Sequence, residues 1–198
     1  MSPWLDSGFK NRDEIAAKLK AQSHRRCIKT HTPLDGIPYD PACSYISIYR
    51  HPMDAHFSMR TQVENMAIDL LGDRFPDDIS KGFRMFVQEP SSNGDADSMT
   101  LESLVHHYET FRDWSHLPNV HMYHYADLSH DLPGQIAQMA SVLGYDLPLS
   151  LLGSITEGAR FGTMQANARQ IGNSKGPSVF KNKAGFFASG SGSKWKNI

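Results

Sequence analysis

The stretch that most constrains the fold is residues 45–58, Tyr-Ile-Ser-Ile-Tyr-Arg-His-Pro-Met-Asp-Ala-His-Phe-Ser. Residues 45–49 are rich in β-branched and aromatic side chains, which predicts a short buried strand. Pro52 suits the first position of a helix, because its fixed φ is already helical and its missing N–H is not needed there. A strand, a turn and a helix start in this order form anion sites in open α/β sheets.

Two polar side chains of this stretch suit an anion site. Arg50 stands where the strand should end and carries a planar, always-charged guanidinium that matches phosphate. Ser58 lies about two turns into the predicted helix and adds a hydroxyl donor. The local pattern leaves a plainer alternative open, in which Arg50 is only a surface charge and Ser58 is only solvated.

The rest of the chain alternates predicted strands and helices. Strands are expected over residues 25–29, 45–49 and 120–125. Helices are expected over residues 11–21, 52–71, 75–87, 100–114, 131–143, 148–158 and 160–169. This alternation predicts an α/β fold with a parallel sheet flanked by helices, in a single domain over residues 1–198. Residues 30–41 and the chain after residue 172 should be loops, and the polar residues 89–98 form either a surface loop or a lid.

Composition excludes several classes of function. The net charge is −1 and the isoelectric point is about 6.8, so no basic surface for nucleic acid or an anionic membrane is expected. No apolar run approaches the roughly 20 residues that span a bilayer, and the N-terminus lacks the layout of a signal peptide, so we expect a cytoplasmic protein. Cys27 and Cys43 fit no disulfide or metal framework and are expected to be buried thiols.

Two pairs of histidines are candidates for a metal site. They are His106 with His107, and His121 with His124. On a strand, residues 121 and 124 point to opposite faces. No cysteine or acidic residue completes either set, so we expect no metal.

A second stretch, Lys-Thr-His-Thr-Pro-Leu at residues 29–34, precedes the strand at 45–49. Together the two stretches resemble the cytosolic sulfotransferase family, in which Lys-Thr-His-x-Pro-Leu precedes a strand ending in Arg-Asn/His-Pro-x-Asp-x-x-x-Ser. Val120–Leu128 resembles the family's strand ending in Tyr-x-Asp-Met/Leu. Phe186–Asn197 is similar to its C-terminal Phe-x-Arg-Lys-Gly-x-x-Gly-x-Trp-Lys-Asn signature. The resemblance covers nearly the whole chain.

The resemblance implies a P-loop-NTPase-like sheet and a sulfotransferase activity. Such an enzyme transfers a sulfuryl group from 3′-phosphoadenosine 5′-phosphosulfate (PAPS) to a hydroxyl or amine of a small-molecule acceptor. The product nucleotide is 3′,5′-adenosine bisphosphate (PAP). No nucleic-acid or membrane partner is implied, a homodimer stays open, and the acceptor has no signature in the sequence.

The resemblance also implies roles for individual residues. His31 matches the family's general base, which takes a proton from the acceptor as the sulfuryl group moves onto it. Lys29 matches a lysine that stabilises charge near the transferred group. The nucleotide positions are Arg50 and Ser58 at the 3′-phosphate, Tyr125 near the adenine, and Gly190 and Trp195 in the C-terminal loop. From the residues alone, a loop histidine, a solvated lysine and a core tyrosine stay open as alternatives.

The chain departs from the family pattern in two places. It contains no Gly-Thr-Thr or Walker-type loop, which in the family cradles the 5′-phosphosulfate. Ser2–Asp6 resembles the segment after the family's first helix, so we expect the first strand, loop and helix to be missing, together with the C-terminal dimer segment. Ala188 and Ser189 stand where the family has Arg-Lys, a loss of two cations that lysines at 181, 183, 194 and 196 could offset.

These departures leave a second function open. It is a non-catalytic sulfotransferase remnant that binds nucleotide weakly or acts as a scaffold. A phosphotransferase of the P-loop group is a weaker alternative, because it needs the same missing loop.

Overall fold

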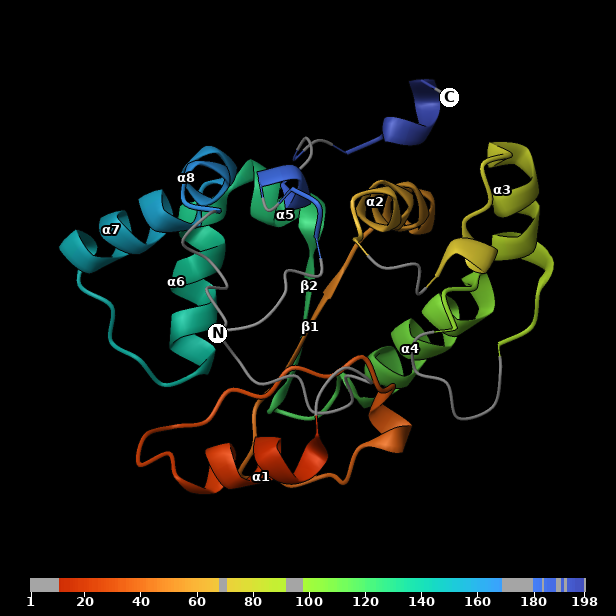
Figure 1. The fold of residues 1–198 in the computed structure, drawn as a ribbon. Helices are drawn as coiled ribbons and strands as arrows, with labels where there is room; N and C mark the ends of the chain where they lie inside the picture. Colours follow the sequence, from red (N-terminus) through yellow and green to blue (C-terminus); the bar gives the residue numbers. More distant parts are fainter. Residues whose placement is uncertain are drawn as a thin grey trace.

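The computed structural model describes residues 11–67, 71–91, 98–168, 180–182, 184–187, 190 and 192–197. Two strands, β1 (Tyr45–Tyr49) and β2 (Val120–His124), lie at its centre (Figure 1). The α-helices are α1 (Arg12–Lys20), α2 (Pro52–Glu64), α3 (Ile79–Gln88), α4 (Leu101–Trp114), α5 (Tyr125–His130), α6 (Leu132–Val142), α7 (Leu149–Ala159) and α8 (Phe161–Ala166). Short 3-10 helices are η1 (Leu34–Gly36), η2 (Gly72–Arg74), η3 (Ala184–Phe186) and η4 (Lys194–Asn197).

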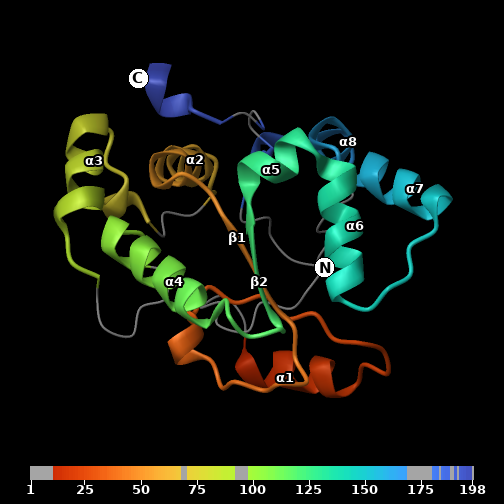
Figure 2. The same ribbon diagram turned by 180° about the vertical axis from the view of Figure 1, so that it is seen from behind.

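The two strands are parallel, with Tyr45 opposite Val120 and Tyr49 opposite His124. Helices α2, α3 and α4 lie on one side of the strand pair, and α5 to α8 lie on the other (Figures 1 and 2). A parallel pair requires a crossover between its strands, and here the chain passes through α2, α3 and α4 before β2. The predicted α/β fold with a parallel sheet flanked by helices is therefore confirmed.

The strand predicted over residues 25–29 is wrong, because the structure has no strand there. All side chains from Arg25 to Lys29 are exposed, and Ile28 is 48 % exposed. Strand residues gain stability mainly by packing one face against neighbours. This segment has no buried face, so its backbone follows an irregular path.

Helix α2 ends at Glu64 rather than near residue 71 as predicted. Asn65 is held by residues 180–182 instead of continuing the helix. Its side-chain amide donates to the carbonyl of Asn182 at 2.7 Å, and its own carbonyl accepts the N–H of Lys181 at 2.7 Å. A longer helix would need that carbonyl for its own ladder.

The remaining predicted elements are confirmed, with shifts at their ends. Helix α3 begins at Ile79 rather than near residue 75, because the carboxylate of Asp78 accepts the N–H of Lys81 at 2.9 Å and caps the helix there. Strand β2 ends at His124, and Tyr125 opens α5 instead of ending the strand. Helix α8 ends at residue 166, before the predicted residue 169.

The core between the strands and α4 includes the loop that precedes β1. Leu34 of this loop is 1 % exposed and packs with Phe111 and Val120. Its N–H donates to Oγ1 of Thr110 at 3.1 Å. Burying one leucine side chain contributes about 1.5–3 kcal/mol. This loop, which contains the short helix η1, is therefore fixed against α4.

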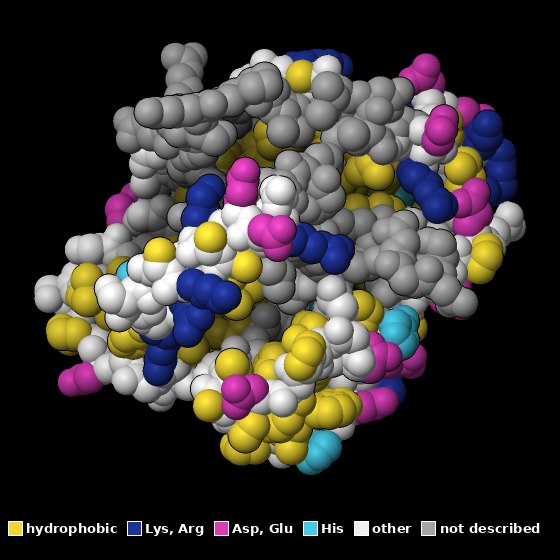
Figure 3. Space-filling view, turned by 60° about the horizontal axis from the view of Figure 1, so that its bottom comes forward, with side chains coloured by type: hydrophobic (Ala, Val, Ile, Leu, Met, Phe, Trp, Pro, Cys, Tyr) yellow, Lys and Arg dark blue, Asp and Glu magenta, His cyan; other side chains and the backbone are white. Residues whose placement is uncertain are grey.

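Basic and acidic side chains are interspersed on the face seen in Figure 3. This distribution agrees with the near-neutral composition. No helix in the described part of the chain is long and apolar enough to cross a membrane. Cys27 and Cys43 are free and exposed, so the expectation of buried thiols is wrong.

A cluster of phenylalanine rings surrounds His56 of α2. The histidine is 3 % exposed, and its ring centroid lies 4.5–5.9 Å from four phenylalanine rings, those of Phe57, Phe75, Phe83 and Phe86. Neither ring nitrogen has a hydrogen-bond partner among the described residues. Burial lowers the pKa of His56, and the nearby charge of Arg60 lowers it further. The ring is therefore neutral near pH 7.

We expect the free energy of unfolding to fall as the pH drops below about 6.5, the ordinary pKa of histidine in an unfolded chain. In that range the unfolded chain binds a proton that folded His56 does not, so stability is lost by up to about 1.4 kcal/mol per pH unit for one such group. Urea denaturation from about pH 7.5 to about pH 5.5 measures this loss.

The variant His56→Phe keeps an aromatic ring but removes the titration, so its stability should depend less on pH. His107, whose pKa burial also lowers, retains part of the dependence. His116→Asn, at an exposed position, is the control and should keep the wild-type slope. The same slope in His56→Phe as in the wild type would contradict the assignment.

Candidate functional site

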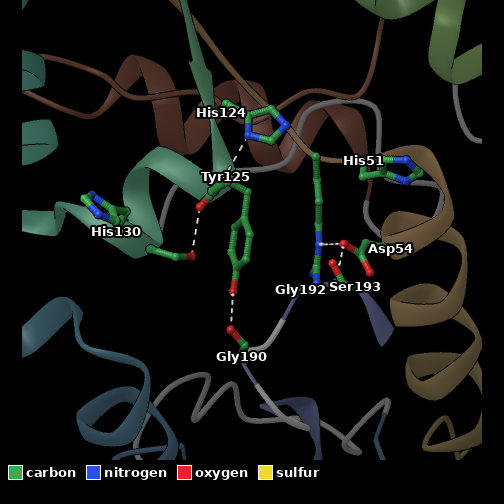
Figure 4. Close-up of a pocket in the computed structure, with 11 residues that line it drawn as sticks. His51, Asp54, His124, Tyr125, His130, Gly190, Gly192 and Ser193 are labelled. Carbon is green, nitrogen blue, oxygen red and sulfur yellow. Dashed lines mark hydrogen bonds and ion pairs between the residues drawn. The ribbon is translucent and has the colours of Figure 1, made fainter. Parts of the chain in front are cut away.

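A cavity of about 430 Å³ opens where β1 and β2 end (Figure 4). Its walls come from the β1–α2 turn, from α5 with the turn before it, and from residues 190, 192 and 193. The lining residues are Arg50, His51, Asp54, His124, Tyr125, Ala126, Ser129, His130, Gly190, Gly192 and Ser193. The volume is within the range of small-molecule sites in proteins.

The strand register brings Arg50 and Tyr125 together. Tyr49 lies opposite His124 in the parallel pair, so the residues that follow them leave the sheet side by side. The guanidinium carbon of Arg50 lies 4.5 Å from the centroid of the Tyr125 ring, a cation–π contact. The ends of the two adjacent strands therefore place Arg50 and Tyr125 next to each other.

Asp54, on the first turn of α2, lies on the other side of Arg50. Its Oδ2 atom is 4.0 Å from Nε of Arg50, which is an ion-pair distance rather than a hydrogen bond. The side chains of Arg50 and Asp54 are 19 % and 7 % exposed. Partial removal from water strengthens the electrostatic interactions of both groups. Arg50 is thus the permanent positive charge among the lining residues, and its orientation is constrained on two sides.

The third wall of the cavity consists of residues 190, 192 and 193, and hydrogen bonds hold it to Tyr125 of α5 and to Asp54 of α2. The hydroxyl of Tyr125 donates to the carbonyl of Gly190 at 3.1 Å, and the N–H of Ser193 donates to Oδ2 of Asp54 at 2.8 Å. Both contacts are drawn in Figure 4. Gly190 has φ +63°, and a Cβ there would lie 2.7 Å from the ring of Phe161. Only glycine meets both conditions without strain.

Trp195 packs beside the cavity on the start of α2. Its ring stacks on that of His51, with centroids 5.4 Å apart and planes inclined by 19°. His51 is the N-cap of α2, and its Nδ1 accepts the N–H of Met53 at 3.3 Å. Lys196 places Nζ 5.4 Å from the centroid of the Trp195 ring. The stacking holds the end of the chain over the positive end of the α2 dipole.

The groups at the cavity fit a phosphate or sulfate group. Arg50 supplies a guanidinium, the start of α2 supplies a positive helix end, and Gly190 and Gly192 leave room for close approach. Asp54 opposes an anion, but its charge is partly offset by Arg50 and by the N–H of Ser193. The cavity can therefore hold an anion that Arg50 engages.

His31 lies in the segment before β1, which packs against α4. The loop that carries it is docked by Leu34 and by a contact between Asp35 and His106, whose Oδ2 and Nε2 atoms are 3.1 Å apart. Burial lowers the pKa of His107, and the nearby His31 lowers it further. His107 is therefore neutral near pH 7 and adds no positive charge there.

Tyr49 connects this histidine pair to the strand. Its hydroxyl lies 3.1 Å from Nδ1 of His107 and 3.2 Å from the carbonyl oxygen of the same residue. Burial raises the pKa of Tyr49 to about 12, so the hydroxyl keeps its proton near neutral pH. Tyr49 and Arg50 are consecutive, so the histidine pair and the anion cavity flank the end of one strand.

The predicted site residues that the structure describes lie in the cavity lining, at its border or outside it. Arg50, Tyr125 and Gly190 line the cavity, and Trp195 stacks on its border. Ser58 is half-buried on α2, one turn beyond Asp54, and does not line the cavity.

Lys29 is exposed and His31 is half-buried, and both lie in the segment before β1, outside the cavity lining. Ala188, Ser189 and Ser2–Asp6 are outside the described residues. The roles predicted for all these residues stay predictions.

Sequence reasoning missed several lining residues. Asp54 was visible only as the acid of the His-Pro-x-Asp motif, and its contact with Ser193 joins positions far apart in the chain. His51 and His124 are N-caps of α2 and α5, and no local sequence signal marks them as part of a cavity. Ser129 and His130 line the cavity from α5, which begins directly after β2.

The model of the Sulfotransferase domain family matches residues 1–198. The chain belongs to the sulfotransferase family. The glycolipid sulfotransferases of Mycobacterium bovis and Mycobacterium tuberculosis are each 31 % identical to it, over 225 and 224 residues, which is 100 % of this chain and 69 % of each relative. The predicted family and its enzyme class are thereby confirmed.

Two solved structures share the fold. Mouse sulfotransferase SULT7A1 complexed with PAP has a TM-score of 0.74 at 20 % identity, covering 94 % of this chain and 64 % of that one. Retinol dehydratase in complex with androsterone and the inactive cofactor PAP has a TM-score of 0.67 at 21 % identity, covering 92 % and 51 %. This sulfotransferase-family chain thus spans half to two thirds of the length of these two proteins.

We expect Gly190→Ala to loosen the third wall of the cavity. The new Cβ would meet the ring of Phe161 at 2.7 Å, and φ +63° costs an L-residue about 1–2 kcal/mol. Hydrogen exchange at residues 190–197 should rise. Gly153→Ala is the matched control, because a Cβ there meets nothing within 4 Å and alanine favours a helix. Unchanged exchange in Gly190→Ala would contradict the assignment.

Proposed function

We propose that this protein transfers a sulfuryl group from PAPS to a hydroxyl or amine of a small-molecule acceptor. The observation that carries the proposal is Arg50 at a strand end, inside a cavity beside the start of α2, in a chain of the sulfotransferase family. Two structures of the same fold contain PAP. The curated relatives are named glycolipid sulfotransferases, so a glycolipid hydroxyl is the first acceptor to assay.

In this proposal the cavity binds the 3′-phosphate end of the nucleotide. Arg50 supplies the charged contact, and Gly190 allows close approach of the backbone. Tyr125 flanks the nucleotide through its ring and holds Arg50 at the same time. Ser58 is proposed as a further hydroxyl donor and Trp195 as a cover of the site.

The chemistry needs a base on the acceptor side. Sulfuryl transfer resembles phosphoryl transfer, with in-line attack and charge spread over equatorial oxygens. When bound, PAPS supplies the sulfuryl group. His31 is proposed to take the proton of the acceptor, and Lys29 to offset charge near the transferred group. Support comes from the electrostatic effect of His31 on His107, whose ring contacts Tyr49, the residue before Arg50.

We expect Arg50→Ala to weaken PAP binding by about 10- to 150-fold, the equivalent of about 1.5–3 kcal/mol for a charged hydrogen bond. Arg50→Lys should be intermediate, because an ammonium lacks the planar fork. Isothermal titration calorimetry measures both. Arg112→Ala is the control, since Arg112 is exposed and pairs with Asp113. Wild-type affinity in Arg50→Ala would remove the cavity from nucleotide binding.

His31→Ala should lower turnover by about 10²- to 10⁴-fold while leaving PAP affinity unchanged, because the base acts on the acceptor. The assay uses labelled PAPS with a glycolipid acceptor, and His116→Ala is the control. Unchanged turnover would remove His31 from the role.

The pair Ala188-Ser189, where the family pattern has two cations, favours a second candidate, the non-catalytic remnant. The same assay separates the two functions. Weak or absent PAP binding by the wild type, without any turnover of PAPS, would favour the remnant.

A further inference from the structure

Gly190, Gly192 and Ser193 form the third wall of the cavity, which we call the C-terminal wall. Two side chains, those of Tyr125 and Asp54, each contact both Arg50 and this wall. Tyr125 packs its ring 4.5 Å from the Arg50 guanidinium and donates its hydroxyl to Gly190. Asp54 pairs with Arg50 at 4.0 Å and accepts the N–H of Ser193 at 2.8 Å. Tyr125 and Asp54 therefore each contact both Arg50 and the C-terminal wall.

Asp54 is placed for this double contact. It is 5 % exposed, lies on the first turn of α2 and points toward Ser193 and Gly192 (Figure 4). A Cβ on Gly192 would lie 3.6 Å from Oδ2 of Asp54, so the backbone of the wall passes close to the carboxylate. An acid on the first turn also stabilises a helix through the dipole. That helical role requires neither the contact with Arg50 nor the contact with Ser193.

The conformation of Ser193 is a separate sign of a held wall. Its φ is +59°, in the left-handed region that a side chain with Cβ rarely adopts. Such a conformation persists only where the surrounding contacts determine it. The N–H that Asp54 accepts belongs to this same residue.

We propose that Asp54 is a positioning residue of the anion site, which docks the C-terminal wall and fixes Arg50 in one arrangement. The proposal rests on the proposed function, because it takes the nucleotide as the ligand of Arg50. Without Asp54 the wall loses its hydrogen bond at Ser193 and Arg50 loses a restraint. Nucleotide binding must then order both groups, which lowers affinity.

Asp54 also has an opposing effect, because its negative charge near Arg50 repels an anion. Two substitutions separate the effects. Asp54→Asn removes the charge but keeps an oxygen that can accept the N–H of Ser193. Asp54→Ala removes both. Asp54→Ser, which retains a small polar side chain suited to the first turn of a helix, is the second variant if Asp54→Ala does not fold.

The first test needs no nucleotide. Hydrogen exchange of residues 190–197 is measured in the free protein. Asp54→Ala should expose the amide of Ser193, whereas Asp54→Asn should protect it nearly as well as the wild type. Asp113→Ala, at an exposed site on α4, is the control. Wild-type protection in Asp54→Ala, or in Asp54→Ser in its place, would overturn the docking role.

The second test is PAP affinity by calorimetry. Asp54→Ala should bind at least about tenfold more weakly than the wild type, and Asp54→Asn as well as the wild type or better. A purely helical role predicts lower thermal stability in both variants with no difference in affinity between them. Equal affinity of Asp54→Ala and the wild type would overturn the positioning role. If the wild type binds no PAP, the proposed function fails, while the exchange experiment still decides whether Asp54 holds the wall.

Discussion

The position of Arg50 between the ring of Tyr125 and the carboxylate of Asp54 is the interaction on which the candidate site depends. It follows from the parallel register, in which Tyr49 and His124 are opposite each other and the next residues leave the sheet together. An arginine at an ordinary strand end would extend into solvent and sample many rotamers. Here a cation–π contact and an ion pair confine it at the mouth of a cavity. A confined guanidinium loses less entropy when it engages an anion.

The end of β1 contacts two different groups of side chains, one on each side of the strand. Tyr49 turns toward α4, where its hydroxyl meets His107 and where the loop with His31 is docked. Arg50 turns toward α5 and the cavity. Because Tyr49 and Arg50 are consecutive, the end of one strand contacts both His107 and the cavity. This arrangement suits a reaction in which one side holds a nucleotide and the other deprotonates an acceptor.

Much of the fold follows from local sequence signals. The β-rich run at residues 45–49 and Pro52 as a helix start each predicted an element that the structure contains. Other features depend on long-range contacts that no local pattern encodes. Helix α2 ends early because residues 180–182 bind Asn65. The strand predicted at residues 25–29 is absent because it has no face to bury.

The candidate site likewise contains residues that the sequence predicted and residues that only long-range contacts bring to it. Arg50 was predicted from its strand-end position and residue type together with the family resemblance, and it lines the cavity. Tyr125 was predicted as a site residue but on a strand, whereas it opens a helix that turns its ring onto Arg50. The role of Asp54 was not predictable, since it depends on Ser193.

The central claim is that Arg50 binds the 3′-phosphate of an adenosine nucleotide in this cavity. A crystal structure of the protein with PAP tests it most directly. We predict the 3′-phosphate within hydrogen-bond distance, about 3 Å, of the Arg50 guanidinium, with Tyr125 and Ser193 still at the walls. A nucleotide bound elsewhere, or a 3′-phosphate that does not contact Arg50, would contradict the account.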